Sequence, residues 1–235
     1  MKWFLTLAIA LLVVGCGSPK PAQTAAQPPA QPPAQVAETT QPAAATDTTA
    51  AKSVTPPPAV KGMLKDTLIP TKLPENLYLT IKVKDYGTMK IKFYTMDAPR
   101  NVANVANLAI KRFYNGLTFH RLIPGFMIQG GDPSGNGTGG PGYTVPAEIS
   151  RRHEKGSMAM ARTGDNVNPK KESSGSQFYI CFAPTPQLDG QYTVIGQLKE
   201  GMDVLDKLAT VKTAGAPTDK PLTPVVMEQV WVTTE

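Results

Sequence analysis

Cysteine and histidine are scarce in this 235-residue chain, and their scarcity limits the chemistry available to it. Only Cys16 and Cys181 could form a disulfide, and only His120 and His153 could join them as metal ligands. A structural zinc site needs four such ligands held close together, and a disulfide framework needs several cysteine pairs. The sequence therefore predicts neither a metal site nor a disulfide-stabilised fold.

The chain also lacks any concentration of charge of one sign. Lys and Arg number 24 against 18 Asp and Glu, and the small surplus is spread along the whole sequence. Binding to nucleic acid would favour clustered basic residues interleaved with aromatic side chains. We therefore expect no nucleic-acid partner.

Long hydrophobic runs are rare, and the longest, Trp3–Val14, has about 12 residues where a membrane-spanning helix needs roughly 20. Its place after Lys2 is typical of a signal peptide, which we assign to residues 1–15. The run ends at Gly15-Cys16, which resembles a bacterial lipobox, so Cys16 is the expected lipidation site. A plain secretory signal with an incidental cysteine is the alternative. An acyl chain would anchor the protein on the extracytoplasmic side of a bacterial membrane without a spanning helix.

The stretch that follows has the composition of a spacer. Residues 17–60 contain ten Pro and twelve Ala but no aromatic residue. Such a stretch cannot bury enough apolar surface to offset the entropy lost on ordering. We interpret residues 16–60 as a lipidated tether to a folded domain at 61–235, and a docking segment for a proline-recognition module is the alternative.

The start of the domain shows clear periodicity. Apolar and polar residues alternate over Leu77–Val83 and again over Met89–Phe93, which predicts an antiparallel hairpin. Asp97 as N-cap and Pro99 in the first turn predict a helix whose run ends at Asn115-Gly116.

Short apolar runs and glycine-rich turns fill the rest of the domain. The spacing within Met202–Leu208 predicts a second helix, and Val225–Val232 predicts a final strand. Many short strands with two helices indicate a mainly β fold, either a closed barrel or a sandwich.

Two other kinds of chemistry, dinucleotide binding and serine hydrolysis, have only weak support in the sequence. Gly135-x-Gly137-x-x-Gly140 matches a dinucleotide fingerprint, but the flanking residues do not form a βαβ pattern. A hydrolase of the Ser-His-Asp type would favour a Gly-x-Ser-x-Gly elbow, which the sequence lacks.

Several longer motifs, occurring in one order, resemble the cyclophilin signature. They are FHRLIPGFMIQGGD at 119–132, GTGGPGY at 137–143, GSMAMA at 156–161, SGSQFYI at 174–180 and LDGQYTVIG at 188–196. The resemblance extends from about Leu77 to Val232. It implies a closed eight-stranded antiparallel barrel capped by two helices, with peptidyl-prolyl cis-trans isomerase activity and no cofactor.

The resemblance also assigns site residues by position. The expected catalytic residues are Arg121, Gln129 and His120. The expected substrate-binding residues are Phe126, Met127, Ala159, Met160, Ala161, Gln177, Tyr179, Leu188 and Tyr192. Within this set, the backbone at Ala159–Ala161 is expected to provide the edge along which a peptide lies. A buried ion pair is the alternative role for Arg121, and a satisfied internal histidine is the favoured alternative for His120.

The expected substrates are proline-containing segments of exported or unfolded proteins. A cyclophilin fold that acts as a peptide-binding chaperone or docking module with little turnover is the alternative. Gln187 stands where many eukaryotic members have a rim tryptophan, so we expect a cyclosporin-like ligand to bind only weakly. Met160 also stands where those members have an asparagine.

Overall fold

The computed structural model describes Leu64, Leu68 and residues 70–235 of the chain. The predicted signal peptide, the lipidation site at Cys16 and the tether at 16–60 lie outside the described residues. Within the described part, no helix is both long enough and apolar enough to cross a membrane.

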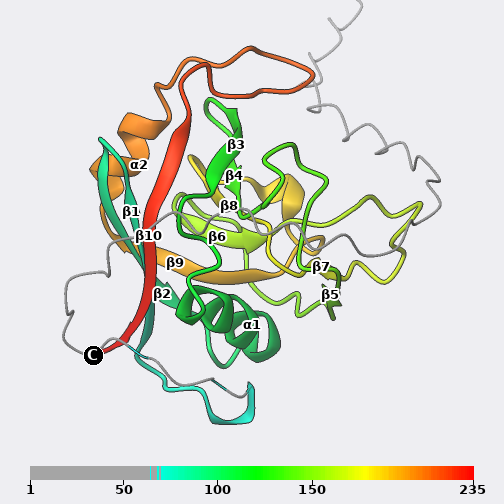
Figure 1. Ribbon diagram of the computed structural model, residues 1–235. Helices are drawn as coiled ribbons and strands as arrows, with labels where there is room; N and C mark the ends of the chain where they lie inside the picture. Colours follow the sequence, from blue (N-terminus) through cyan, green and yellow to red (C-terminus); the bar gives the residue numbers. More distant parts are fainter. Residues whose placement is uncertain (1–63, 65–67, 69) are drawn as a thin grey trace, which may run out of the picture. The chain divides into compact units, whose positions relative to one another are not determined.

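Eight strands close into an antiparallel barrel, as the sequence predicted (Figure 1). In spatial order they are β1 (Leu77–Val83), β10 (Val225–Thr234), β3 (Thr118–Ile123), β4 (Met127–Gly130), β8 (Phe178–Cys181), β6 (Ser157–Met160), β9 (Val194–Glu200) and β2 (Gly87–Phe93). Two short strands, β5 (Thr144–Val145) and β7 (Ser173–Ser174), pair with each other outside the barrel. Single turns of 3-10 helix occur at η1 (Pro70–Lys72) and η2 (Pro186–Leu188).

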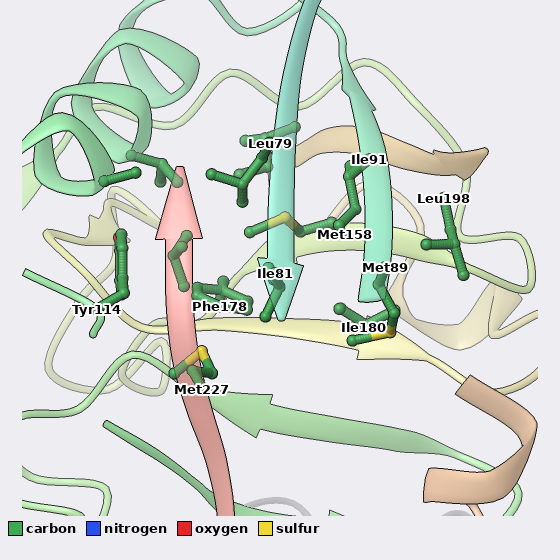
Figure 2. Packing of buried hydrophobic residues seen from close by; sticks show 14 of the residues in the cluster. Leu79, Ile81, Met89, Ile91, Tyr114, Met158, Phe178, Ile180, Leu198 and Met227 are labelled. Atoms are coloured by element: carbon green, nitrogen blue, oxygen red, sulfur yellow. The ribbon is translucent and has the colours of Figure 1, made fainter. Parts of the chain in front are cut away.

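The predicted hairpin at the start of the domain is confirmed. Strands β1 and β2 pair antiparallel, with Leu79 opposite Ile91 and Ile81 opposite Met89. These four side chains are fully buried and belong to one hydrophobic core with Phe178, part of which Figure 2 shows. Alternation with period two therefore places one face of each strand in the main core.

Two α-helices, α1 (Pro99–Ile110) and α2 (Met202–Leu208), contribute the buried side chains Val102, Val105, Leu205 and Leu208 to the same core. They lie toward opposite ends of the barrel (Figure 1). The prediction of two helices is therefore confirmed.

The start of α1 differs from the prediction. Its N-cap is Ala98 rather than Asp97, and the Asp97 carboxylate instead accepts a 2.8 Å hydrogen bond from Arg151. The free N–H groups of the first turn are bonded by Glu148, which accepts from the backbone N of Arg100 at 3.1 Å and of Asn101 at 2.9 Å. A carboxylate from a distant loop thus supplies the anionic cap that suits a helix N-terminus.

Candidate active site

A β-bulge in β3 sets the direction of Arg121. Phe119 pairs with Gly130 across β3 and β4, but Arg121 pairs with Gln129, so the register shifts at His120. Bulges of this kind re-aim side chains. As a result Phe119 is buried in the main core, whereas Arg121 and Ile123 point to the outer face of the barrel.

From Arg121 a row of directly opposed residues crosses five neighbouring strands. Arg121 pairs with Gln129, Gln129 with Tyr179, Tyr179 with Ala159, and Ala159 with Val194. Opposed residues on antiparallel strands project their side chains to the same face of the sheet. Residues 73 positions apart in the sequence, Arg121 and Val194, are thereby placed on one surface.

The outer face carries a second apolar cluster, separate from the main core, which we call the pocket cluster. Its buried members are Met127, Ala159, Ala161, Tyr179, Cys181 and Val194, and the partly buried residues packed against it are Tyr94, Ile123, Phe126, Leu188 and Tyr192. Seven of the predicted substrate-binding residues belong to it, namely Phe126, Met127, Ala159, Ala161, Tyr179, Leu188 and Tyr192. The structure therefore brings most of the predicted set together beside Arg121.

Two buried glutamines form the polar border of this surface. Gln129 Nε2 donates to Gln177 Oε1 at 2.9 Å. Gln177 Nε2 in turn donates to the carbonyl oxygens of Gly137 and Gly139 at 3.0 and 2.8 Å. The amide groups are thus fixed in orientation next to Arg121.

Arg121 forms an ion pair with Asp219, a partner that could not be identified from the sequence. Its Nε donates to Asp219 Oδ2 at 3.4 Å, and the Arg121 side chain remains 23% exposed. Among the described residues, neither terminal nitrogen of the guanidinium has a hydrogen-bond partner. The pair is therefore not the fully buried one considered as an alternative role, and two nitrogens of the guanidinium can donate to a bound molecule.

His120 occupies the bulge and is only 6% exposed. Neither of its ring nitrogens has a hydrogen-bond partner in the described part of the chain, which gives no support to the interpretation as a satisfied internal histidine. Burial lowers its pKa below the usual value, although the charge of Asp132 opposes this effect. A catalytic role for His120 stays a prediction.

The backbone expected to bind the peptide, Ala159–Ala161, lies in β6 and directly after it. Strand β6 pairs with β8 on one side and with β9 on the other, and Ala161 N donates to the carbonyl of Gln177 at 3.0 Å. The backbone N–H of Met160 likewise donates to the carbonyl of Thr193 at 2.9 Å, and the peptide-binding role of this backbone stays a prediction. Ala159 and Ala161 contribute side chains to the pocket cluster, whereas the Met160 side chain lies in the main core.

A polar connection that leads to Tyr179 of the pocket cluster could not be predicted from the sequence. His153 Nδ1 lies 2.9 Å from Asp189 Oδ1, and His153 Nε2 lies 2.9 Å from the hydroxyl of Tyr179. The motif that contains Asp189 was recognised, but nothing in the local sequence shows that His153, 36 residues earlier, contacts it.

Gln187, which stands where many eukaryotic cyclophilins have the rim tryptophan, is exposed and lies in η2. Weak binding of cyclosporin-like ligands stays a prediction.

Within the described residues, no group of three or more His, Cys, Asp or Glu side chains could hold a metal ion.

Comparisons with known proteins agree with this geometry. The sequence model of the family described as "Cyclophilin type peptidyl-prolyl cis-trans isomerase/CLD" matches residues 78–232. A peptidyl-prolyl cis-trans isomerase of Helicobacter pylori is 43% identical over 141 residues, which cover 58% of this chain and 82% of the relative. Peptidyl-prolyl cis-trans isomerase B of Bacillus subtilis is 44% identical over 124 residues, covering 52% of this chain and 82% of the relative.

A solved structure shows a similar fold. The crystal structure of a cyclophilin type peptidyl-prolyl cis-trans isomerase of Cryptosporidium parvum, determined in the presence of the dipeptide Ala-Pro, has a TM-score of 0.61 and 29% sequence identity. The similarity covers 67% of this chain and 99% of that chain.

Proposed function

Since this chain belongs to the family of cyclophilin-type peptidyl-prolyl cis-trans isomerases, we propose that Arg121 drives its isomerase activity by donating a hydrogen bond to the prolyl nitrogen. The pocket cluster holds the proline ring during this step. The observation that carries the proposal is that the two terminal nitrogens of Arg121 have no partner within the described part of the chain, while neighbouring residues on the same face of the sheet form the apolar pocket cluster.

The chemistry explains why such a donor is needed. Rotation about an X-Pro bond is opposed by a barrier of about 18 to 20 kcal/mol, because the nitrogen lone pair is delocalised into the carbonyl. A hydrogen bond to that nitrogen localises the lone pair and lowers the barrier. Arginine suits this role, because its guanidinium remains protonated and its donors have fixed directions.

A single charged hydrogen bond contributes about 1.5 to 3 kcal/mol. A 10⁴-fold acceleration needs about 5.4 kcal/mol, so the pocket must supply the remainder. The apolar side chains of Phe126, Met127 and Leu188 can hold the proline ring while the preceding carbonyl rotates. The second N–H of the Gln129 amide, which Gln177 holds in orientation, can donate to the rotating carbonyl.

The proposal is tested by the exchange of cis and trans forms of a short proline peptide, followed by NMR with the purified full chain. Catalytic amounts of protein should accelerate the exchange. A protein that binds the peptide without accelerating its exchange would instead be the peptide-binding module considered above.

Asp219 is expected to orient Arg121 through its contact with the guanidinium Nε. Its carbonyl accepts from Leu122 N at 2.8 Å, which ties the loop before β10 to β3. Asp219→Asn should lower kcat of the isomerase by about threefold to tenfold with little change in KM, because a neutral amide holds the guanidinium less firmly. Asparagine also tolerates the φ of 49° at this position, so the loop should be preserved.

Asp206→Asn is a matched control, because Asp206 forms an exposed ion pair with Lys155 and neither residue belongs to the pocket cluster. Its kcat should equal that of the wild type. Equal kinetics for Asp219→Asn and Asp206→Asn would show that Asp219 does not position Arg121.

We further propose that the enzyme acts on exported proteins from a membrane surface. The support is the sequence alone: an apolar run that ends at Cys16, followed by a Pro- and Ala-rich stretch. Cys16→Ala should release the protein from the membrane fraction or block its maturation, since the acyl chain is the proposed anchor.

Fractionation of bacterial cells after a high-salt wash measures this effect, and Cys181→Ala serves as the matched cysteine control. A Cys16→Ala protein that has lost its signal peptide and still remains in the membrane fraction would refute the lipid anchor.

A further inference from the structure

Three buried or partly buried polar side chains form a continuous hydrogen-bonded line that ends at Tyr179, a member of the pocket cluster. Asp189 follows η2, His153 precedes β6, and Tyr179 lies in β8. Asp189 Oδ1 lies 2.9 Å from His153 Nδ1 and also accepts a 2.8 Å hydrogen bond from the backbone N of His153. His153 Nε2 is 2.9 Å from the hydroxyl of Tyr179.

The chemistry of these groups fixes the direction of each hydrogen bond. Burial raises the pKa of Asp189, but the hydrogen bonds from His153 outweigh it and hold the pKa below its usual value. An ionised carboxylate can only accept, so His153 Nδ1 carries the proton. Burial lowers the pKa of His153, although Asp189 opposes the effect, so the ring is neutral at pH 7. Nε2 therefore accepts, and the hydroxyl of Tyr179 donates.

The same histidine joins two parts of the pocket that are distant in sequence. Its carbonyl accepts a 2.9 Å hydrogen bond from Thr185 N, at the start of the segment that carries Leu188 and Tyr192. The rings of His153 and Tyr179 lie nearly parallel, at 7° with centroids 6.0 Å apart. The ring of Tyr192 stands edge-on to both.

We propose that His153 is a positioning residue for isomerisation, which fixes the Tyr179 floor of the proline pocket relative to the rim at Leu188–Tyr192. This inference rests on the proposed function, because that function places Tyr179 and Leu188 against the proline ring. A pocket that favours the twisted amide must keep its walls in place, and small displacements are costly for catalysis. Without His153, the hydroxyl of Tyr179 would be buried with no partner and the ring would move to find one.

Kinetics of the full chain test the proposal. His153→Leu should lower kcat/KM for a proline tetrapeptide by about tenfold, largely through KM, because a displaced floor weakens proline binding throughout the reaction. His153→Gln should retain most of the activity, since its amide oxygen can accept from Tyr179. Adding Tyr179→Phe to His153→Leu should restore part of the loss, because the unpaired hydroxyl is then removed.

Leu208→Ala is the matched control for lost stability, because Leu208 is fully buried in the main core on α2. At a temperature at which all variants are folded, its kcat/KM should equal that of the wild type. His153→Leu with kcat and KM both within twofold of the wild type would overturn the proposal, as would a double variant no better than His153→Leu.

A spectroscopic signature provides an independent test if His153→Leu does not fold. In ¹⁵N NMR spectra, His153 should show a protonated Nδ1 and an unprotonated Nε2, and the dipeptide Ala-Pro should shift the Nε2 resonance. The groups facing His153 are Asp189, Tyr179 and Tyr192, with the charge of Arg152 near Asp189. Tyr179→Phe should abolish the shift, and an equal shift in that variant would overturn the proposal.

Arg121→Ala, assayed in parallel, separates this inference from the proposed function. Full activity of Arg121→Ala would refute the mechanism as a whole. Loss of activity in Arg121→Ala combined with wild-type kinetics in His153→Leu would refute only the positioning role of His153.

Discussion

Arg121→Ala should lower kcat/KM of the isomerase by at least tenfold while the barrel remains folded. The lost interaction is a charged hydrogen bond to the prolyl nitrogen, and about 1.5 to 3 kcal/mol corresponds to roughly 13-fold to 160-fold in rate. The fold should tolerate the change, because the Arg121 side chain is 23% exposed and lies outside the main core. A proline-peptide isomerisation assay together with urea unfolding measures both quantities.

Arg121→Lys should also be poor, although it keeps the positive charge. The ammonium group of lysine sits on a flexible stem and cannot donate to Asp219 and to a substrate in the fixed geometry of the guanidinium. Arg100→Ala is the matched control, because Arg100 is exposed on α1, and it should leave the rate unchanged. A folded Arg121→Ala protein with the activity of Arg100→Ala would end the proposed mechanism.

Phe178→Ala should have the largest effect on stability, a loss of about 3 to 5 kcal/mol in the free energy of unfolding. Phe178 is fully buried, and its ring stands edge-on to Tyr114 and Phe119 with centroids 5.6 and 6.2 Å apart. Its removal leaves a cavity between β8 and the loop after α1, at a point where the barrel cannot collapse without shifting Gln177 and Tyr179.

Urea unfolding followed by far-UV circular dichroism measures this loss. Val167→Ala is the control, because Val167 is 61% exposed and its substitution should change stability by less than about 0.5 kcal/mol. A loss below about 1 kcal/mol for Phe178→Ala would show that this aromatic cluster is not central to the core.

Local periodicity explains how much of the fold could be predicted from the sequence. The alternation in Leu77–Val83 has a period of two and is visible without any knowledge of its partners. The start of α1 was misjudged because Asp97 is a favourable capping residue, and its competing partner Arg151 is 54 residues away in the sequence.

The site residues could likewise be predicted where a local motif contains them, but their contacts with distant segments could not. Arg121 and the residues of the pocket cluster could be located because short motifs carry them, but their arrangement depends on the bulge at His120 and on cross-strand pairing. Contacts of Arg121 with Asp219 and of His153 with Asp189 and Tyr179 join segments 26 to 98 residues apart. Such contacts have no local signature, so only the folded chain reveals them.

The most direct test of the central claim compares substrate binding with bond rotation in one sample. NMR exchange spectroscopy of a proline peptide with the full chain gives both the Kd of the peptide and the cis-trans exchange rate in the bound state. Because the hydrogen bond from Arg121 to the prolyl nitrogen strengthens only as the amide twists, Arg121→Ala should reduce the bound exchange rate at least tenfold and change Kd less than threefold. A bound exchange rate equal to that of the wild type would contradict the account.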